Sequence, residues 1–309
     1  MKNKKKKKPN NNNSNNPGPT NNNQMNLNYF LIPKDTKNAL GANPHQIVNN
    51  LYLLYHKLIQ AKINNNKGEI LKYYNNLCNV SDKIYQVSFF NKINNQNIES
   101  AKSLFGENYK AFEMTNQWRL AIGLGNESVY ETSLSLHYIY GIPYIPGQSL
   151  KGAVRSYIIQ TYFNGNESLA ISTSEAFCKI FGTPEFIEVK GKRVFSILKK
   201  DFQGDVVFYD AFPKDSFQLK EDIMNPHYSE YYSSKKPPAD IYAPIPIKFL
   251  VLEETRFQFI IGLLSRENYE VEWQGKEIKI LDLIEQLTKE ALEKGGLGGK
   301  TSVGYGYFQ

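Results

Sequence analysis

The order of strand and helix patterns over residues 116–309 constrains the fold more than any other feature of the sequence. Two amphipathic helix patterns stand between runs rich in β-branched and aromatic residues. The predicted helices cover 149–163 and 279–296, and the predicted strands cover 118–124, 132–140, 205–212, 245–252, 256–264 and 300–308. Their order is strand, helix, strand, strand, helix, strand, with insertions. This order predicts an α+β fold with a ferredoxin-like (RRM-like) core and helices on one face of the sheet.

The first of these helices follows two prolines and a glycine, which form a rigid approach to Ser149 at the expected N-cap position. Its predicted apolar face comprises Leu150, Val154, Tyr157, Ile158 and Thr161. Lys151 and Arg155 are four residues apart, so both project from one face of the first turns. Unpaired N–H groups at a helix start, together with two cations, are suited to bind phosphate. The predicted RNA-binding residues here are Ser149, Lys151 and Arg155. A solvated cationic stripe explains the same spacing equally well.

The glycine-rich end of the chain, GGLGGKTSVGYGYF, contains the Gly-Lys-Thr triplet of a nucleotide-binding P-loop. That motif also needs a glycine at position 294, which is Lys294, and a long helix after the triplet. Only eight residues follow the triplet, and they have strand character, which counts against an ATPase. We predict instead a flexible loop that lets a phosphodiester backbone approach closely. The predicted contacts are Gly298, Gly299, Lys300 and Thr301.

A third candidate is the stretch DIMNPHYSEYY, in which a histidine stands among tyrosines. A histidine in this setting is suited to act as a base in RNA cleavage or to stack on a nucleobase. It has no second histidine nearby in the sequence, so a hydrogen-bonded turn residue is the simpler interpretation. The residues considered for a structural or stacking role are His227, Tyr228, Tyr231 and Tyr232. The remaining histidines, His45, His56 and His137, are predicted to be packing or surface residues.

The N-terminal segment, residues 1–25, is predicted to be a disordered Lys/Asn-rich tail. Its first 24 residues have no apolar side chain after Met1, so they cannot bury enough surface to offset the entropy of ordering. They hold six lysines and no other ionisable side chain, and these account for six of the +7 net charges. The rest of the chain is therefore close to neutral, and any nucleic-acid surface must be a local patch.

Residues 26–115 are predicted to form a mostly helical region ahead of the core, which is assigned to 116–309. Apolar residues at helical spacing follow Pro44, and the pattern continues to about residue 114. No run approaches the ~18 apolar residues of a membrane span. The two cysteines, Cys78 and Cys178, are far apart, which fits a reduced cytoplasmic protein and gives no metal framework. We expect no metal or cofactor.

Three stretches together resemble the RAMP superfamily of CRISPR systems: PGQSLKGAVR, the C-terminal GGLGGKTSVGYGYF, and MNPHYSEYY followed by PPADIYAPIPIKFL. The first two are general to the superfamily, and the third is most similar to subunit six of the type III-B Cmr effector complex. The resemblance covers residues 117–309. It implies a ferredoxin-like core and a non-catalytic ribonucleoprotein subunit that binds the 3′ part of a guide RNA. The tail has no counterpart in this resemblance.

The resemblance also implies partners and roles. Guide RNA, target RNA and other Cmr subunits would be the partners, and Lys151, Arg155, Gly298, Gly299 and Lys300 would contact guide phosphates. Target cleavage would belong to a neighbouring subunit, so no catalytic residue is expected. Two alternatives stay open: a metal-independent RAMP endoribonuclease that matures guide RNA with His227 and Tyr231, and a type III-A subunit of the same superfamily.

Overall fold

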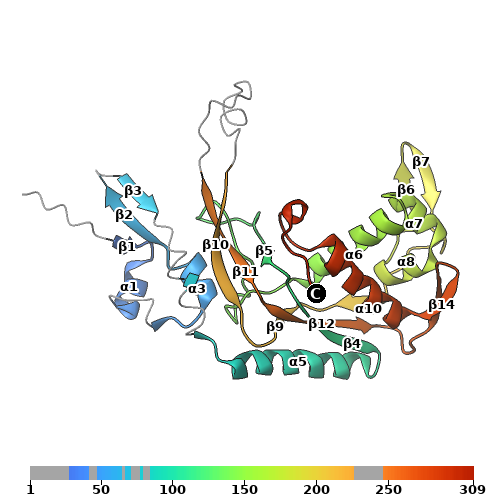
Figure 1. Ribbon diagram of the computed structural model, residues 1–309, viewed down its shortest axis with the longest axis horizontal. Coiled ribbons are helices and arrows are strands. Elements are labelled where there is room, and N and C mark those ends of the chain that lie inside the picture. The colour runs from blue at the N-terminus through green and yellow to red at the C-terminus, as the bar shows by residue number, and fades with distance from the viewer. Residues whose placement is uncertain (1–27, 42–46, 65–66, 71–76, 79–83, 226–245) are drawn as a thin grey trace, which may run out of the picture.

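The computed structural model describes residues 28–41, 47–64, 67–70, 77–78, 84–225 and 246–309, and it is a mixed α+β structure with several antiparallel sheets (Figure 1). The predicted tail over 1–25 and the stretch containing His227, Tyr228, Tyr231 and Tyr232 lie outside the described residues. The predictions made for both segments therefore stay predictions.

The central sheet has the strand order β4-β12-β8, formed by β4 (Tyr109–Thr115), β12 (Arg256–Leu263) and β8 (Val206–Phe208). Both pairings are antiparallel, and β9 (Phe212–Pro213) also pairs with β12. Every residue of β12 after Arg256 is buried, which is typical of a strand covered on both faces. The helix α5 (Val87–Phe105) lies along one side of this sheet (Figure 1).

A second antiparallel sheet has the order β10-β11-β5. Its strands are β10 (Gln218–Met224), β11 (Ile247–Glu253) and β5 (Arg119–Leu120). The two strands predicted over 245–264 are confirmed as β11 and β12, but they belong to different sheets. The strand predicted over 118–124 is confirmed only at β5. The strand predicted over 132–140 is wrong: this segment forms turns, with one isolated bridge between Leu136 and Pro143.

The helix α6 (Gly147–Tyr162) confirms the first predicted helix, with a different start. Its N-cap residue is Pro146, so Ser149 lies inside the first turn and does not cap the helix. The predicted apolar face is correct at Leu150, Val154 and Ile158, which are buried. It is wrong at Thr161, which is exposed, whereas the neighbouring Ile159 and Phe163 are buried. The short helices α7 (Glu167–Thr173) and α8 (Glu175–Phe181) follow.

The second predicted helix is confirmed as α10 (Ile280–Glu290), which continues as a π-helical turn over Ala291–Gly295. The final strand predicted over 300–308 is wrong. Residues Thr301–Val303 form a 3₁₀ turn, and only isolated backbone contacts follow. Gly304 and Gly306 have φ of 95° and 75°, and these left-handed conformations interrupt an extended strand. The last residues still run antiparallel to 115–119, where the Gly306 N–H donates to the Arg119 carbonyl at 2.8 Å.

The prediction that residues 44–114 are mostly helical is partly wrong. The described helices of the N-terminal region are α1 (Lys34–Leu40), α3 (Leu51–His56) and α5. Between α3 and α5, β2 (Gln60–Asn64) pairs with both β1 (Asn28–Phe30) and β3 (Lys67–Ile70). The segment over 109–115 is the strand β4, in which Phe112 and Met114 are buried at a spacing of two, which is the period of a strand and not of a helix.

Two β-hairpins project from the α6–α8 and α10 side of the molecule (Figure 1). One pairs β6 (Phe186–Val189) with β7 (Lys192–Phe195), and the other pairs β13 (Glu270–Trp273) with β14 (Lys276–Lys279). Neither hairpin was predicted from the sequence.

Candidate nucleic-acid interface

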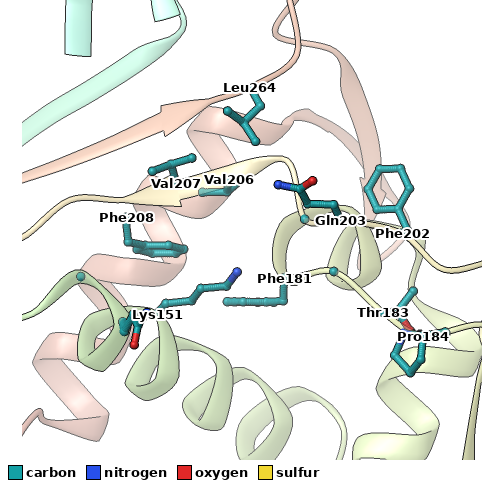
Figure 2. Close-up of a pocket in the computed structure, with 14 residues that line it drawn as sticks. Lys151, Phe181, Thr183, Pro184, Phe202, Gln203, Val206, Val207, Phe208 and Leu264 are labelled. Atoms are coloured by element: carbon teal, nitrogen blue, oxygen red, sulfur yellow. Dashed lines mark hydrogen bonds between the residues drawn. The ribbon is translucent and has the colours of Figure 1, made fainter. Parts of the chain in front are cut away.

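A cleft of about 540 Å³ lies between the start of α6, the strand β8 and the segments 181–184 and 202–204. The side chain of Lys151 extends into this cleft, with its ammonium toward Phe181 (Figure 2). The rings of Phe181 and Phe208 are nearly parallel, at 11°, with centroids 6.4 Å apart. Lys151 therefore presents its charge in a recess with aromatic walls.

The Lys151 ammonium has no carboxylate partner among the described residues. Burial lowers its pKa from the ordinary value of a lysine, and the nearby charge of Arg155 lowers it further. A half-buried cation without a partner loses hydration and gains no compensating charge. Lys151 is thus poised to bind an anion.

The N-terminus of α6 is occupied by a carboxylate of the protein itself. The Gly147 N–H donates a hydrogen bond of 2.7 Å to Oδ1 of Asp210. A Cβ at position 147 would stand 2.2 Å from the Phe208 carbonyl oxygen, so only glycine lets α6 begin this close to β8. An anion at this end of α6 would compete with Asp210 for the Gly147 N–H, and phosphate binding at the helix start stays a prediction. The cation of the cleft comes from the side chain of Lys151.

Arg155 lies on the same side of α6 as Lys151, as predicted, but it has a partner within the protein. Its Nη2 is 2.6 Å from Oε1 of Glu167, and its guanidinium carbon is 5.3 Å from the centroid of the Phe177 ring. Sequence spacing gave no sign of this ion pair, since Glu167 belongs to a different helix. Ser149 is exposed and does not line the cleft itself, but it follows Gln148, which does.

The glycines of the C-terminal loop pack against the protein's own backbone. Gly298 has φ of +93°, and a Cβ there would stand 2.5 Å from the Ala121 carbonyl oxygen. The Gly299 N–H donates to the same oxygen at 2.8 Å. At Gly299 a Cβ would make only ordinary contacts, the nearest at 3.6 Å. Packing against Ala121 thus requires a glycine at position 298, whereas packing does not require one at position 299.

Lys300 lies in a different neighbourhood from Lys151, over the β10-β11-β5 sheet. Its backbone is left-handed, with φ of 61°, and its ammonium is 5.6 Å from the Phe249 ring and 5.7 Å from the Tyr305 ring. Thr301 is half-buried, and its carbonyl accepts a hydrogen bond of 3.2 Å from the Tyr307 hydroxyl. The predicted site residues therefore form two groups, one on α6 and one on the C-terminal loop.

An exposed tryptophan, which was not predicted as a site residue, contacts the same Tyr305 ring as Lys300. Trp118 is 47% exposed, with its ring centroid 4.9 Å from that of Tyr305 and 5.2 Å from the guanidinium carbon of Arg119. Arg119 in turn pairs with Asp222 at 2.6 Å and with Glu253 at 2.8 Å. The dipeptide Trp-Arg in a sequence predicted to be a strand was the available signal for this cluster.

The described histidines are held by packing, as predicted for His56 and His137. Burial lowers the pKa of both imidazoles. His137 stacks on Tyr140, with ring centroids 4.5 Å apart, and its Nδ1 accepts a hydrogen bond from the Tyr140 N–H.

Within the described part of the chain, no group of three or more His, Cys, Asp or Glu is placed to hold a metal ion. No helix in that part is long and apolar enough to cross a membrane.

Comparison with known families gives a match to the model of the RAMP superfamily over residues 119–309. The chain is 36% identical over 235 residues to the CRISPR system Cmr subunit Cmr6 of Pyrococcus furiosus, covering 62% of this chain and 64% of that protein. It is 28% identical over 203 residues to the CRISPR system CMR subunit Cmr6 of Saccharolobus solfataricus, covering 64% of this chain and 56% of that protein. The chain thus spans less than two thirds of the length of these relatives.

Among solved structures, a chain of the type III-B Cmr-beta complex bound to cognate target RNA is similar, with 22% sequence identity and a TM-score of 0.48. The similarity covers 75% of this chain and 69% of that one.

Proposed function

Because the chain belongs to the RAMP superfamily, we propose that it is a Cmr6-type subunit of a type III-B CRISPR ribonucleoprotein complex. In this role it binds the 3′ part of the guide RNA and helps the complex target foreign RNA in the cytoplasm. Its partners are guide RNA, target RNA and neighbouring Cmr subunits. The support is the identity to curated Cmr6 subunits across about 62% of the chain.

We infer that the core is a variant of the ferredoxin-like fold. The supporting observation is the pairing order. The C-terminal segment 305–309 bonds to 115–119, β4 pairs with β12, and β12 pairs with β8. The helix α6 stands between the first and second of these strands in the sequence, and α10 stands between the third and the last segment. Three strands, the C-terminal segment in the place of a fourth, and two helices in this order match the ferredoxin-like arrangement.

The observation that carries the RNA-binding proposal is the Lys151 ammonium in the aromatic-walled cleft, which has no carboxylate partner among the described residues. Single-stranded nucleic acids bind where cations meet the backbone phosphates and aromatic rings receive bases. The Phe181 and Phe208 rings and the Lys151 charge supply both elements in one recess. Contacts with phosphate carry no base information, which suits a guide whose sequence varies.

The remaining predicted residues take secondary roles in this proposal. Arg155 adds positive potential beside Lys151 while it stays paired with Glu167. Gly299, Lys300 and Thr301 form a second backbone contact at the C-terminal loop, next to Trp118. Gly298 does not contact RNA in this proposal; it fixes the position of the loop by packing closely against Ala121. Ser149 offers its exposed hydroxyl at the rim of the cleft.

We propose that the subunit binds RNA without cleaving it, and that cleavage of target RNA belongs to another subunit. The test is to incubate the full chain with labelled repeat-containing RNA in EDTA and to score retention and cleavage together. Retention without cleavage, weakening steeply with salt, is the expected result. Cleavage at one position that is lost in His227→Ala would refute the proposal and establish a guide-processing nuclease instead.

A further inference from the structure

The β6–β7 hairpin is connected to segments that form one wall of the Lys151 cleft. Thr183 and Phe202, which both line the cleft, form an antiparallel bridge. Beyond a turn over residues 197–200 the two segments meet again, since the Ser196 N–H donates to the Glu185 carbonyl at 2.8 Å and Phe186 pairs with Phe195. The hairpin is therefore connected to the cleft wall at both of its ends, and it extends beside α7 and α8 (Figure 1).

The hairpin and the turn after it, residues 185–201, carry five cations and three carboxylates (Glu185, Glu188 and Asp201), which gives a net charge of +2. The five cations of this segment are all exposed, and none makes an ion pair with another described residue. They are Lys190, Lys192, Arg193, Lys199 and Lys200. Because the chain beyond its first 24 residues is close to neutral, this segment is a local excess of charge of the kind that a polyanion requires.

One face of the hairpin also carries an aromatic platform. Phe186 and Phe195 are cross-strand partners with ring centroids 5.7 Å apart, and the Arg193 guanidinium carbon lies 4.4 Å from the centroid of Phe186. Phe195 is 49% exposed. Since opposite partners in a ladder project to the same side, these three side chains share one face. An exposed ring beside a guanidinium is a surface on which a nucleobase stacks.

The β13–β14 hairpin provides an internal comparison. It has strands of the same length, and its turn residues Gln274 and Gly275 have φ of 52° and 74°, against 52° and 75° for Lys190 and Gly191. The same turn is therefore made without lysine. The β13–β14 strands hold three glutamates and two lysines, whereas the ten residues of the β6–β7 hairpin hold three cations and one glutamate. The geometry of the hairpin does not explain its charge.

From these observations we propose that the β6–β7 hairpin is an RNA-binding surface that extends the Lys151 cleft. A base stacks on Phe195, and the backbone phosphates contact the lysines in a sequence-independent manner. Lys200 joins the two parts, because its ammonium lies 5.8 Å from the ring of Phe202 at the edge of the cleft. The exposed ring favours RNA over an acidic protein segment, which would need the cations alone. This inference rests on the proposed function, and it names a further part of the chain that holds the RNA.

The test uses the full chain and a fluorescein-labelled oligouridylate, with binding measured at several salt concentrations. The triple variant Lys190→Gln, Lys192→Gln, Arg193→Gln should lower the salt slope by about 2, at ~0.7 for each lost contact with a single strand. Phe195→Ala should weaken binding about fivefold or more, as expected for one lost stacking contact. The matched control, Lys276→Gln with Lys279→Gln on the β13–β14 hairpin, should bind like the unmodified protein.

A local readout separates stacking from any effect on folding. In Phe195→Trp the added indole should lose fluorescence when the oligouridylate binds, and an oligomer of poly-glutamate should leave it unchanged. If the unmodified chain binds RNA and Lys151→Ala weakens it, but all hairpin variants bind normally, the inference is refuted and the proposed function stands. If the unmodified chain does not bind RNA, both are refuted. Quenching by poly-glutamate but not by RNA would assign the hairpin to an acidic protein partner.

Discussion

The two adjacent glycines of the C-terminal loop should respond very differently to the same substitution. In Gly298→Ala the new Cβ would meet the Ala121 carbonyl oxygen at 2.5 Å, in a backbone conformation with φ of +93°. In Gly299→Ala the Cβ would make only ordinary contacts at 3.6 Å or more. Gly298→Ala should therefore destabilise the fold, whereas Gly299→Ala should not.

The cost at Gly298 has two parts. A left-handed conformation costs a residue with a side chain about 1–2 kcal/mol. Relief of the contact with Ala121 must also shift the loop and weaken the 2.8 Å hydrogen bond from the Gly299 N–H, which is worth about 0.5–1.5 kcal/mol. The sum is about 1.5–3.5 kcal/mol in the free energy of unfolding. At ~2–4 °C per kcal/mol, the melting temperature should fall by roughly 3–14 °C.

Thermal melting followed by circular dichroism, together with RNA binding by each variant, checks this prediction. Gly299→Ala should melt within about 0.5 kcal/mol of the unmodified protein. It should bind RNA more weakly if, as proposed, the RNA backbone contacts this part of the loop. A Gly298→Ala protein that melts normally would show that the close approach to Ala121 does not constrain this position. Normal RNA binding by Gly299→Ala would remove this part of the loop from the site.

Two further predictions concern the charges of α6. Because burial lowers the pKa of Lys151, RNA affinity should fall with rising pH earlier than for an ordinary lysine, and Lys151→Met should abolish this pH dependence. The buried, charged ammonium also destabilises the folded state at any pH below its lowered pKa. Lys151→Met should therefore leave the melting temperature at neutral pH unchanged or raise it. A clear decrease would contradict the placement of Lys151 as a half-buried cation without a partner. Glu167→Gln removes the carboxylate that pairs with Arg155 at 2.6 Å, so RNA binding at low salt should become stronger. Weaker binding would show that Arg155 contributes only when Glu167 fixes its position.

Strong local periodicity made part of this fold predictable from the sequence. The strands β11 and β12 and the helices α6 and α10 were predicted because each carries a long apolar run at one clear period. The strand β4 was missed because its seven residues follow a genuine 19-residue helix, whose pattern was extended too far. The final strand was overestimated because aromatic residues suggested extension while Gly304 and Gly306 prevent it.

Only those features of the candidate site that depend on a single side chain, such as the charge of Lys151, could be predicted from the sequence. Lys151 was identified from its place on a basic helix start, and the structure gives it a cleft. The partners of its neighbours were not predictable, because Asp210 at the start of α6 and Glu167 beside Arg155 come from other elements. The aromatic walls were missed for the same reason, since Phe181 and Phe208 are 27 positions apart in the sequence. Local sequence patterns thus identify which cations share a helix face. Tertiary contacts determine which of these cations are paired with a carboxylate of the protein.

The most direct test of the central claim measures the salt dependence of RNA binding for the full chain and for Lys151→Ala, with two guide RNAs of unrelated spacer sequence. The account predicts that Lys151→Ala reduces affinity for both guides equally and lowers the salt slope by about 0.7, the contribution of one phosphate contact with a single strand. An unchanged slope, or an effect on only one of the two guides, would contradict recognition of the RNA backbone at the Lys151 cleft.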